Sequence, residues 1–358
     1  MKPLPKAALL RFHRPQRRLN AKMITRIKIQ NYRSFVDAEV NLRPFSLVVG
    51  ANGSGKSNVL SAIAGTSAKG ISRHKDKDRY WTILDAGWSP HARHIGKPAH
   101  IKLEGDDIKP IDCTVPPGIG TSCFAHEDNA PWKSPFPIFN LDPGKISGIE
   151  DVVASAGVRA DGSGTAQVLE MLKNGDREDL FDSIEEHFCR YVPEVEKLSL
   201  RTVQQGKKQI QVREKGLGNA VLPATELSEG TRLVLSILTI IHQEKPAPVI
   251  LLEDIDRGLH PRLFEYMAPL MKDIAERHNV NILATTHNPY LVDCFQDDKE
   301  AVIIVEKKDG ASTLSTLADR LKDLDYDKVD PDDMPLGNLW FSGLVGGVPR
   351  PIKLRPHA

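Results

Sequence analysis

The stretch "FSLVVGANGSGKSNVL" (residues 45 to 60) decides the fold of this chain. Its residues 50 to 57 fit the phosphate-loop pattern G-x-x-x-x-G-K-[ST]. The apolar run before the loop predicts a buried strand, and the residues after it predict a helix. In that setting successive backbone N–H groups at the positive end of a helix can face nucleotide phosphates. A glycine-rich turn with an incidental lysine is the alternative interpretation.

The residue types of the loop indicate individual roles. We expect Lys56 to neutralise the β- and γ-phosphates of ATP, and Ser57 to be a ligand of Mg²⁺. ATP and Mg²⁺ are therefore the expected cofactors. The other candidate nucleotide-binding residues of the loop are Asn52, Gly53, Ser54, Gly55 and Asn58.

Three further apolar runs, at residues 248–253, 280–286 and 301–306, resemble the strand before the loop. Continuous apolar runs suit strands that are covered on both faces, as in a parallel sheet flanked by helices. Residues 24–32 and 36–42 differ, because in the second run Val36, Ala38, Val40 and Leu42 alternate with polar residues. That alternation predicts a half-buried antiparallel pair. The fold class is therefore α/β, with a mostly parallel central sheet and an antiparallel β subdomain.

Two of the apolar runs end in polar side chains. Glu253 is placed to hold Mg²⁺ through water, and Asp254 to orient the attacking water. His287 can donate a hydrogen bond to the γ-phosphate. The alternatives are solvated acids that open the next helix, which suits Asp256 better, and a structural or merely exposed histidine. With the strand before the phosphate loop, these two runs deliver their polar residues to the edge where α/β sheets bind ligands.

Composition and charge bound the remaining possibilities. The 358 residues carry a formal net charge of +1, with the charged and apolar fractions of a soluble globular protein. Residues 1–22 hold seven Lys and Arg and no acid, which indicates a disordered leader, a nucleic-acid arm or a transit peptide. No apolar run is long enough for a bilayer. Cys113, Cys123, Cys189 and Cys294 show no C-x-x-C pairing, so we expect neither a zinc site nor a disulfide framework, and a cytoplasmic location.

The phosphate loop and the segments "LSEG", "LLED", "GLHP" and "TTHNP" follow one another in an order that resembles the ABC-type ATPases. "IQNYRSF", "RGLHP" and "TTHNP" narrow the resemblance to the RecF, SMC and OLD-nuclease branch. They also resemble the AAA-labelled ATPases of bacterial anti-phage systems such as Septu, retron and PARIS loci. The resemblance implies an ABC-ATPase-type head over residues 23–310, with an insertion at about 66–160, a helical signature lobe at about 161–245 and a short extension at 311–358.

The resemblance also assigns roles. Ser228 and Gly230 of "LSEG" would cap the γ-phosphate held by the opposite protomer of a head-to-tail homodimer, although Ser228 is equally compatible with an ordinary helix cap. Arg33 and Ser34 would approach the nucleotide's base or α-phosphate; a strand-end charge is the alternative for Arg33. Asp256 would lie in the loop that signals between the two sites. The resemblance leaves the glutamine-loop residue unassigned.

Two functions compete. The first is an ATPase of slow turnover that dimerises, or assembles further, on ATP and regulates a separately encoded effector, a nuclease, in anti-phage defence. The slow rate is expected because the presumed base, Asp254, is one methylene shorter than the usual glutamate. The alternative is a RecF-like repair ATPase that binds DNA through the leader and Lys207-Lys208. A transporter subunit is disfavoured, and a nuclease domain of the Toprim type is not expected after residue 310. An acidic turn is the expected role of residues 330–333.

Overall fold

The computed structural model describes residues 23–66, 97–106, 110–115, 124–125, 136–153, 156–216, 220–244, 246–324 and 334–349. The basic leader, residues 67–96 of the expected insertion and the acidic turn at 330–333 lie outside the described residues. The interpretations of those three segments stay predictions.

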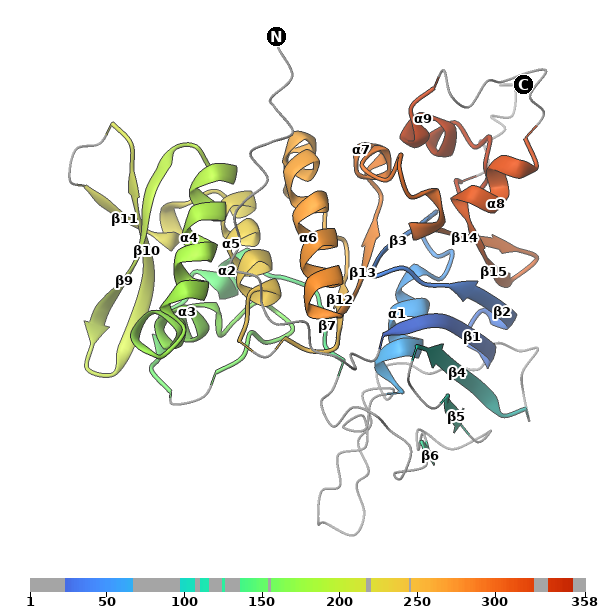
Figure 1. The fold of residues 1–358 in the computed structure, drawn as a ribbon, viewed down its shortest axis with the longest axis horizontal. Coiled ribbons are helices and arrows are strands. Elements are labelled where there is room, and N and C mark those ends of the chain that lie inside the picture. Colours follow the sequence, from blue (N-terminus) through green and yellow to red (C-terminus); the bar gives the residue numbers. More distant parts are fainter. Residues whose placement is uncertain are drawn as a thin grey trace, which may run out of the picture.

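A large sheet of eleven strands runs through the molecule (Figure 1) in the order β6-β5-β4-β1-β2-β15-β14-β3-β13-β12-β7. The strands are β1 Ile24–Tyr32, β2 Phe35–Asn41, β3 Phe45–Gly50, β4 Ala99–Gly105, β5 Ile111–Val115, β6 Phe124–Ala125, β7 Ile138–Phe139, β12 Val249–Leu252, β13 Asn281–Thr286, β14 Val302–Lys308 and β15 Ala311–Thr316. β14, β3, β13, β12 and β7 are parallel to one another. The prediction of a mostly parallel sheet from the four apolar runs is confirmed.

The parallel strands are apolar throughout because each face of the sheet has its own core. Along β3, Leu47 and Val49 belong to one buried cluster, and Val48 between them belongs to the other. Helix α1 (Lys56–Ala64) contributes its apolar residues to the cluster of Val48, and helix α6 (Phe264–His278) contributes to the opposite one. Successive side chains of a strand point to opposite faces, so a strand covered on both sides shows no polar alternation.

The antiparallel part of the sheet begins with the expected pair, since Ile27 lies opposite Val40 in the β1–β2 register. One detail of the prediction is wrong: Val36 is 41% exposed, and Phe35 is buried in its place. Phe35 directly follows the tight turn at Arg33 and faces Tyr32, so it turns into the core before the alternation starts. β4 and β5, from the expected insertion, extend this part next to β1.

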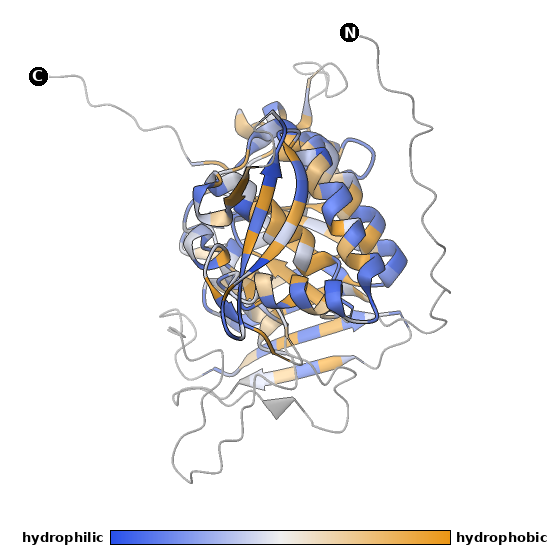
Figure 2. Ribbon diagram, turned by 90° about the vertical axis from the view of Figure 1, so that its left-hand side faces the viewer, coloured by the Kyte–Doolittle hydropathy of each residue, from blue (hydrophilic) through white to orange (hydrophobic). Residues whose placement is uncertain are grey.

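A second lobe combines a small antiparallel sheet with helices. It contains α2 Pro143–Ile146, β8 Glu150–Asp151, α3 Thr165–Asn174, α4 Glu178–Tyr191, β9 Val195–Gln204, β10 Lys207–Glu214, β11 Val221–Pro223, η5 Ala224–Glu226 and α5 Glu229–Ile241. Figure 2 looks onto this lobe and shows hydrophobic and hydrophilic residues alternating along its strands. β9 and β10 form a hairpin, with Gly206 at its turn at a φ of 71°. Lys208 pairs with Glu170 at 2.9 Å, on the inner side of this lobe.

Five further short helices occur in the described part of the chain. They are η6 Pro261–Leu263, α7 Pro289–Asp293, η7 Lys299–Ala301, α8 Leu317–Lys322 and α9 Leu336–Phe341. α8 and α9 lie at the end of the molecule opposite the second lobe, and α7 lies between them and α6 (Figure 1). α9 packs tightly on α7, because a Cβ at Gly337 would lie 2.1 Å from the Pro289 carbonyl oxygen. The Gly337 N–H donates to Asp293 Oδ1 at 2.7 Å. Glycine is therefore required at this contact.

The cysteines differ in part from the expectation. Cys189 and Cys294 are free thiols, but Cys113 is disulfide-bonded. The expectation that the chain has no disulfide framework is thus not met at Cys113, because the spacing of cysteines along the chain does not show which of them the fold brings together. Among the described helices, none has the length and apolar character required to cross a membrane.

Buried His242 predicts a loss of stability in acid. Burial lowers its pKa from 6.5 to about 4, and its ring donates from Nδ1 to the Leu238 carbonyl oxygen at 2.9 Å. Between pH 4 and pH 6.5 this histidine binds more protons in the unfolded chain than in the folded chain. The free energy of unfolding is therefore unaffected by it above pH 6.5 and decreases as the pH falls towards 4. We expect this histidine to cost about 2 kcal/mol of unfolding free energy at about pH 5 relative to about pH 7.5.

Urea unfolding at both pH values tests this expectation. His242→Gln should remove most of the difference, whereas His260→Gln, at an exposed position, should retain it. The ring of His187, 5.4 Å from that of His242, also has a pKa lowered by burial, so a residual slope is expected. An unchanged slope in His242→Gln would contradict the assignment.

Candidate nucleotide site

The register of the parallel strands brings three loops to one edge of the sheet. Val49 lies opposite Thr286 in β13, and Ala284 lies opposite Leu252 in β12. The residues that follow these strands, the phosphate loop, Glu253 and His287, are therefore neighbours. This is the juxtaposition that the sequence analysis expected.

The phosphate loop has the backbone shape that its glycines permit. Gly53 and Gly55 have φ values of 72° and 118°, where residues with a Cβ are disfavoured. A Cβ at Gly50 would lie 2.4 Å from the Val305 carbonyl oxygen, so β14 excludes any side chain there. Asn52 and Gly53 are exposed at the tip of the loop.

Lys56 folds over the loop. Its Nζ donates to the carbonyl oxygens of Gly50 and Ala51 at 2.9 and 3.1 Å. Burial lowers the pKa of Lys56, and the nearby carboxylates of Asp254, Asp256 and Glu253 act in the opposite direction. The lysine is thus held between the loop and the acids after β12.

Ser57 and Glu253 meet as the sequence analysis expected of the Mg²⁺ ligands. Ser57 Oγ donates a hydrogen bond to Glu253 Oε1, and the Glu253 N–H donates to the Phe139 carbonyl oxygen at 2.8 Å. Hydroxyl and carboxylate oxygens are hard donors, and Mg²⁺ typically takes one or two protein ligands and completes its shell with phosphates and water. No group of three or more His, Cys, Asp or Glu side chains suited to a metal occurs among the described residues. The pair therefore fits Mg²⁺ bound together with a nucleotide.

Asp254 adopts an unusual backbone conformation, with a φ of 48°. The Thr285 hydroxyl holds it there, accepting from the Asp254 N–H at 2.8 Å and donating to Asp254 Oδ1 at 3.4 Å. Left-handed conformations are uncommon for residues other than glycine and are frequent at functional sites. The carboxylate is thus fixed at the end of β12 with one oxygen tied to β13.

His287 and Asp256 are joined across the strand ends. Asp256 Oδ1 accepts from the Thr286 hydroxyl at 2.7 Å and from the His287 N–H at 3.4 Å. Burial lowers the pKa of His287, and the positive charge of Lys56 lowers it further. The imidazole is therefore neutral at pH 7 and can donate one hydrogen bond.

Arg33, Ser34 and Asn58 form a connected group beside the loop. Arg33 Nη1 donates to Asn58 Oδ1 at 2.9 Å, and Asn58 Nδ2 donates to Ser34 Oγ at 3.0 Å. Arg33 itself lies in the left-handed region, at a φ of 49°. The sequence analysis placed all three near the nucleotide, and the structure places them against the start of α1.

Ser228 and Gly230 lie apart from this group, at the start of α5 in the second lobe (Figure 1). Ser228 caps the helix, accepting from the Thr231 N–H at 3.1 Å. A Cβ at Gly230 would lie 2.5 Å from the Gly258 carbonyl oxygen, so the signature packs on the "RGLHP" loop through glycine. Together these residues border a cavity of about 590 Å³ that also includes His260. The phosphate loop does not line this cavity.

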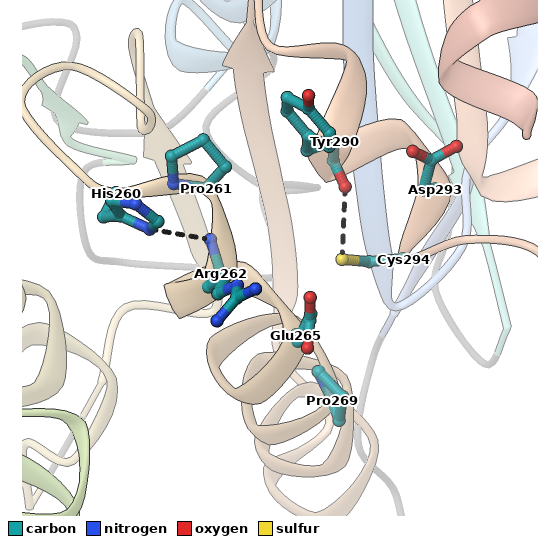
Figure 3. Close-up of a pocket in the computed structure, with 8 residues that line it drawn as sticks. All are labelled: His260, Pro261, Arg262, Glu265, Pro269, Tyr290, Asp293 and Cys294. Atoms are coloured by element: carbon teal, nitrogen blue, oxygen red, sulfur yellow. Dashed lines mark hydrogen bonds between the residues drawn. The ribbon is translucent and has the colours of Figure 1, made fainter. Parts of the chain in front are cut away.

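A second cavity, of about 690 Å³, lies between η6, α6 and α7 (Figure 3). Its lining residues are His260, Pro261, Arg262, Glu265, Pro269, Tyr290, Asp293 and Cys294. None of them belongs to the phosphate loop or to the acidic pair. This cavity is therefore separate from the candidate nucleotide site.

Sequence reasoning missed two residues of the site. Ser312 of β15 donates to the Ser54 carbonyl oxygen and contacts Ser34 Oγ at 2.7 Å. Asn140 follows β7, whose Phe139 lies opposite Leu252, so Asn140 and Glu253 are at adjacent strand ends. No local motif marks either residue, because pairing between strands that are distant in sequence places Ser312 beside the loop and Asn140 beside Glu253.

Two protein-family models match segments of the chain. Residues 163–293 match a family described as "AAA domain, putative AbiEii toxin, Type IV TA system", and residues 23–109 match a family described as "AAA ATPase domain". No match was found among curated protein sequences.

Solved structures show the same fold. An SMC head bound to the C-winged-helix domain of ScpA has a TM-score of 0.54 and 18% identity, covering 82% of this chain and 97% of its own. The SMC head of Pyrococcus furiosus, with an extended coiled coil and the C-terminal domain of ScpA, has a TM-score of 0.50 and 16% identity, covering 86% of this chain and 100% of its own. Two segments of the chain therefore match AAA-type ATPase families, and the fold of the chain is similar to that of SMC heads.

Proposed function

We propose that the chain binds and hydrolyses ATP with Mg²⁺ and associates head to tail with a second copy through composite ATP sites. The observation that carries this proposal is the separation of the two half-sites. Ser57 and Glu253 are in contact beside Lys56, whereas Ser228 and Gly230 lie on the other lobe and border a cavity without phosphate-loop residues. A nucleotide on one protomer is thus completed by the signature of another.

In this proposal, residues at the carboxyl ends of the parallel strands each have a role in hydrolysis. Lys56 and the loop N–H groups bind the phosphates, and Ser57 and Glu253 hold Mg²⁺, which supplies charge neutralisation on the β- and γ-oxygens. Asp254, fixed by Thr285, orients the attacking water and accepts its proton. His287, as a neutral imidazole, donates to the γ-phosphate.

Asn140 completes this arrangement as the amide that sequence reasoning left unassigned. It stands at the end of β7, one strand beyond Glu253, and is exposed. Its amide can both donate and accept hydrogen bonds at this edge. Its segment leads directly into α2 and the second lobe, so it can relay occupancy of the site to the signature.

The loop after Asp254 connects the two half-sites within one protomer. Asp256 is bound to Thr286 at one end of this loop, and Gly258 packs on Gly230 at the other. A change at His287 is therefore transmitted to the signature through a few close contacts. This coupling supports a switch in which association follows nucleotide state.

The switch regulates a separately encoded effector, a nuclease, in anti-phage defence. Its support is the "putative AbiEii toxin" family over residues 163–293, and the SMC heads that were solved with ScpA domains bound. Direct DNA binding in the RecF manner is less favoured, because Lys208 is engaged with Glu170. A cytoplasmic location is part of the same proposal.

The two acids after β12 should give different defects. Glu253→Gln should weaken Mg²⁺-dependent ATP binding, because it removes the charged oxygen that pairs with Ser57. Asp254→Asn should leave ATP binding intact and lower the hydrolysis rate about 100-fold or more, because it removes the base. Nucleotide titrations with and without Mg²⁺, combined with steady-state phosphate release, separate the two. Wild-type turnover in Asp254→Asn would contradict its role as the base.

The association should depend on the signature. Asp254→Asn with ATP should form a dimer in sedimentation velocity. A second change, Ser228→Arg, should abolish that dimer yet leave ATP affinity within about twofold, because Ser228 does not touch the loop of its own chain. Glu226→Arg, two residues earlier and exposed, is the matched control. A dimer that persists with Ser228→Arg, or forms without nucleotide, would refute the composite site.

Control of an effector is tested by expressing the chain with its neighbouring genes. A nuclease should copurify with the wild-type chain, and its activity should change with Lys56→Ala. Sequence-independent, salt-sensitive DNA binding by the chain alone would instead favour the repair alternative. Nuclease activity that is the same with wild type and Lys56→Ala would overturn the regulatory proposal.

A further inference from the structure

A buried chain of hydrogen bonds runs from Arg33 to the backbone of the phosphate loop. In order, it joins Arg33 to Asn58, Asn58 to Ser34, Ser34 to Ser312, and Ser312 to the Ser54 carbonyl oxygen. Ser34 and Ser312 are 7% and 2% exposed. Three segments that are distant in sequence, residues 33–34, 54–58 and 312, thus meet behind the loop.

Valence fixes the direction of this chain. The Ser54 carbonyl can only accept, so the single hydroxyl proton of Ser312 is donated to it. The Ser34 hydroxyl must then donate to Ser312, at 2.7 Å, and accept from Asn58 Nδ2. Asn58 Oδ1 in turn accepts from Arg33. The chain begins at the positive charge of Arg33, whose Nη1 also donates to Ser61 Oγ at 3.4 Å.

The last bond orients a peptide group of the loop. In a planar trans peptide the C=O and the following N–H point to opposite sides. Because Ser312 holds the Ser54 carbonyl towards β15, the Gly55 N–H is directed away from β15. A Cβ at Gly55 would lie 3.0 Å from Ser312 Oγ and 3.1 Å from Ser34 Oγ. Glycine therefore lets both hydroxyls approach this peptide group closely.

We propose that Ser312 is a positioning residue for nucleotide binding. It holds the Ser54–Gly55 peptide in the orientation that presents the Gly55 N–H to a phosphate, and through Ser34 and Asn58 it ties that orientation to Arg33. The backbone of β15 is also bonded to this group of residues, since the Ser312 N–H donates to the Ser34 carbonyl oxygen at 2.7 Å. The inference rests on the proposed ATP site and adds a residue outside every motif of that site.

The test compares three variants in the full chain. Ser312→Ala removes the donor to Ser54, Ser312→Thr retains a hydroxyl, and Ser46→Ala is the matched control. Ser46 is fully buried on β3, where its hydroxyl accepts from the Arg43 N–H at 2.9 Å, at the end of the strand remote from the loop. Ser46→Ala thus removes a buried hydroxyl from the same sheet without touching the site.

Dissociation constants for MgATP and MgADP are measured beside the melting temperature. Both alanine variants should melt earlier than wild type, but only Ser312→Ala should bind both nucleotides about tenfold more weakly, and Ser312→Thr should recover most of that loss. Hydrogen exchange of the peptide covering residues 50–58 should rise in Ser312→Ala alone. If Ser312→Thr does not fold, Ser34→Ala, which interrupts the same chain, should weaken binding in the same direction.

The outcomes separate this inference from the function beneath it. Nucleotide affinity in Ser312→Ala equal to that in Ser46→Ala overturns the positioning role and leaves the ATP site standing. Absence of nucleotide binding by the wild-type chain, or binding that survives Lys56→Ala, overturns the ATP site itself.

Discussion

The parallel hydrogen bonding of β3, β13 and β12 is the constraint on which the rest of the structure depends. It sets the Phe45–Gly50, Asn281–Thr286 and Val249–Leu252 segments in one register, so their carboxyl ends meet at one edge. A slip of one residue would exchange the faces of every side chain in a strand. Because both faces are covered by apolar cores, such a slip would bury and expose the wrong sets of residues. The same packing that stabilises the sheet therefore holds Ser57 against Glu253.

Contacts that need glycine connect this edge to the second lobe. Gly230 touches the backbone at Gly258, as Gly50 touches the backbone at Val305. Contacts of this kind have little freedom to adjust, since any Cβ would overlap a carbonyl oxygen. Displacement of one partner therefore moves the other. This stiffness gives the signature a mechanical connection to the loop after Asp254, in the proposed switch.

Much of the fold and site followed from local sequence patterns. Continuous apolar runs predicted the parallel strands, and residues at strand ends predicted Ser57, Glu253 and His287 as neighbours. The sequence did not reveal Ser312 or Asn140, because only pairing between distant strands places Ser312 beside the loop and Asn140 beside Glu253. The prediction that Val36 is buried was wrong for a related reason. The turn at Arg33 and the packing of Phe35 against Tyr32 decide which residues of β2 face the core. The link between Ser57 and a carboxylate was predictable as chemistry, but its geometry was not.

The charges at the edge indicate which ligand the proposed site requires. Glu253, Asp254 and Asp256 all act on the pKa of Lys56, so three carboxylates stand near one ammonium group. A polyphosphate without a cation would meet net repulsion there, because one lysine cannot offset both the acids and the phosphate oxygens. In the proposed site, a divalent cation at Ser57 and Glu253 would reverse that balance, and the positive end of a partner's α5 would add to it. The metal, the nucleotide and the second protomer each change the balance of charge at this edge. The proposed switch therefore requires all three together.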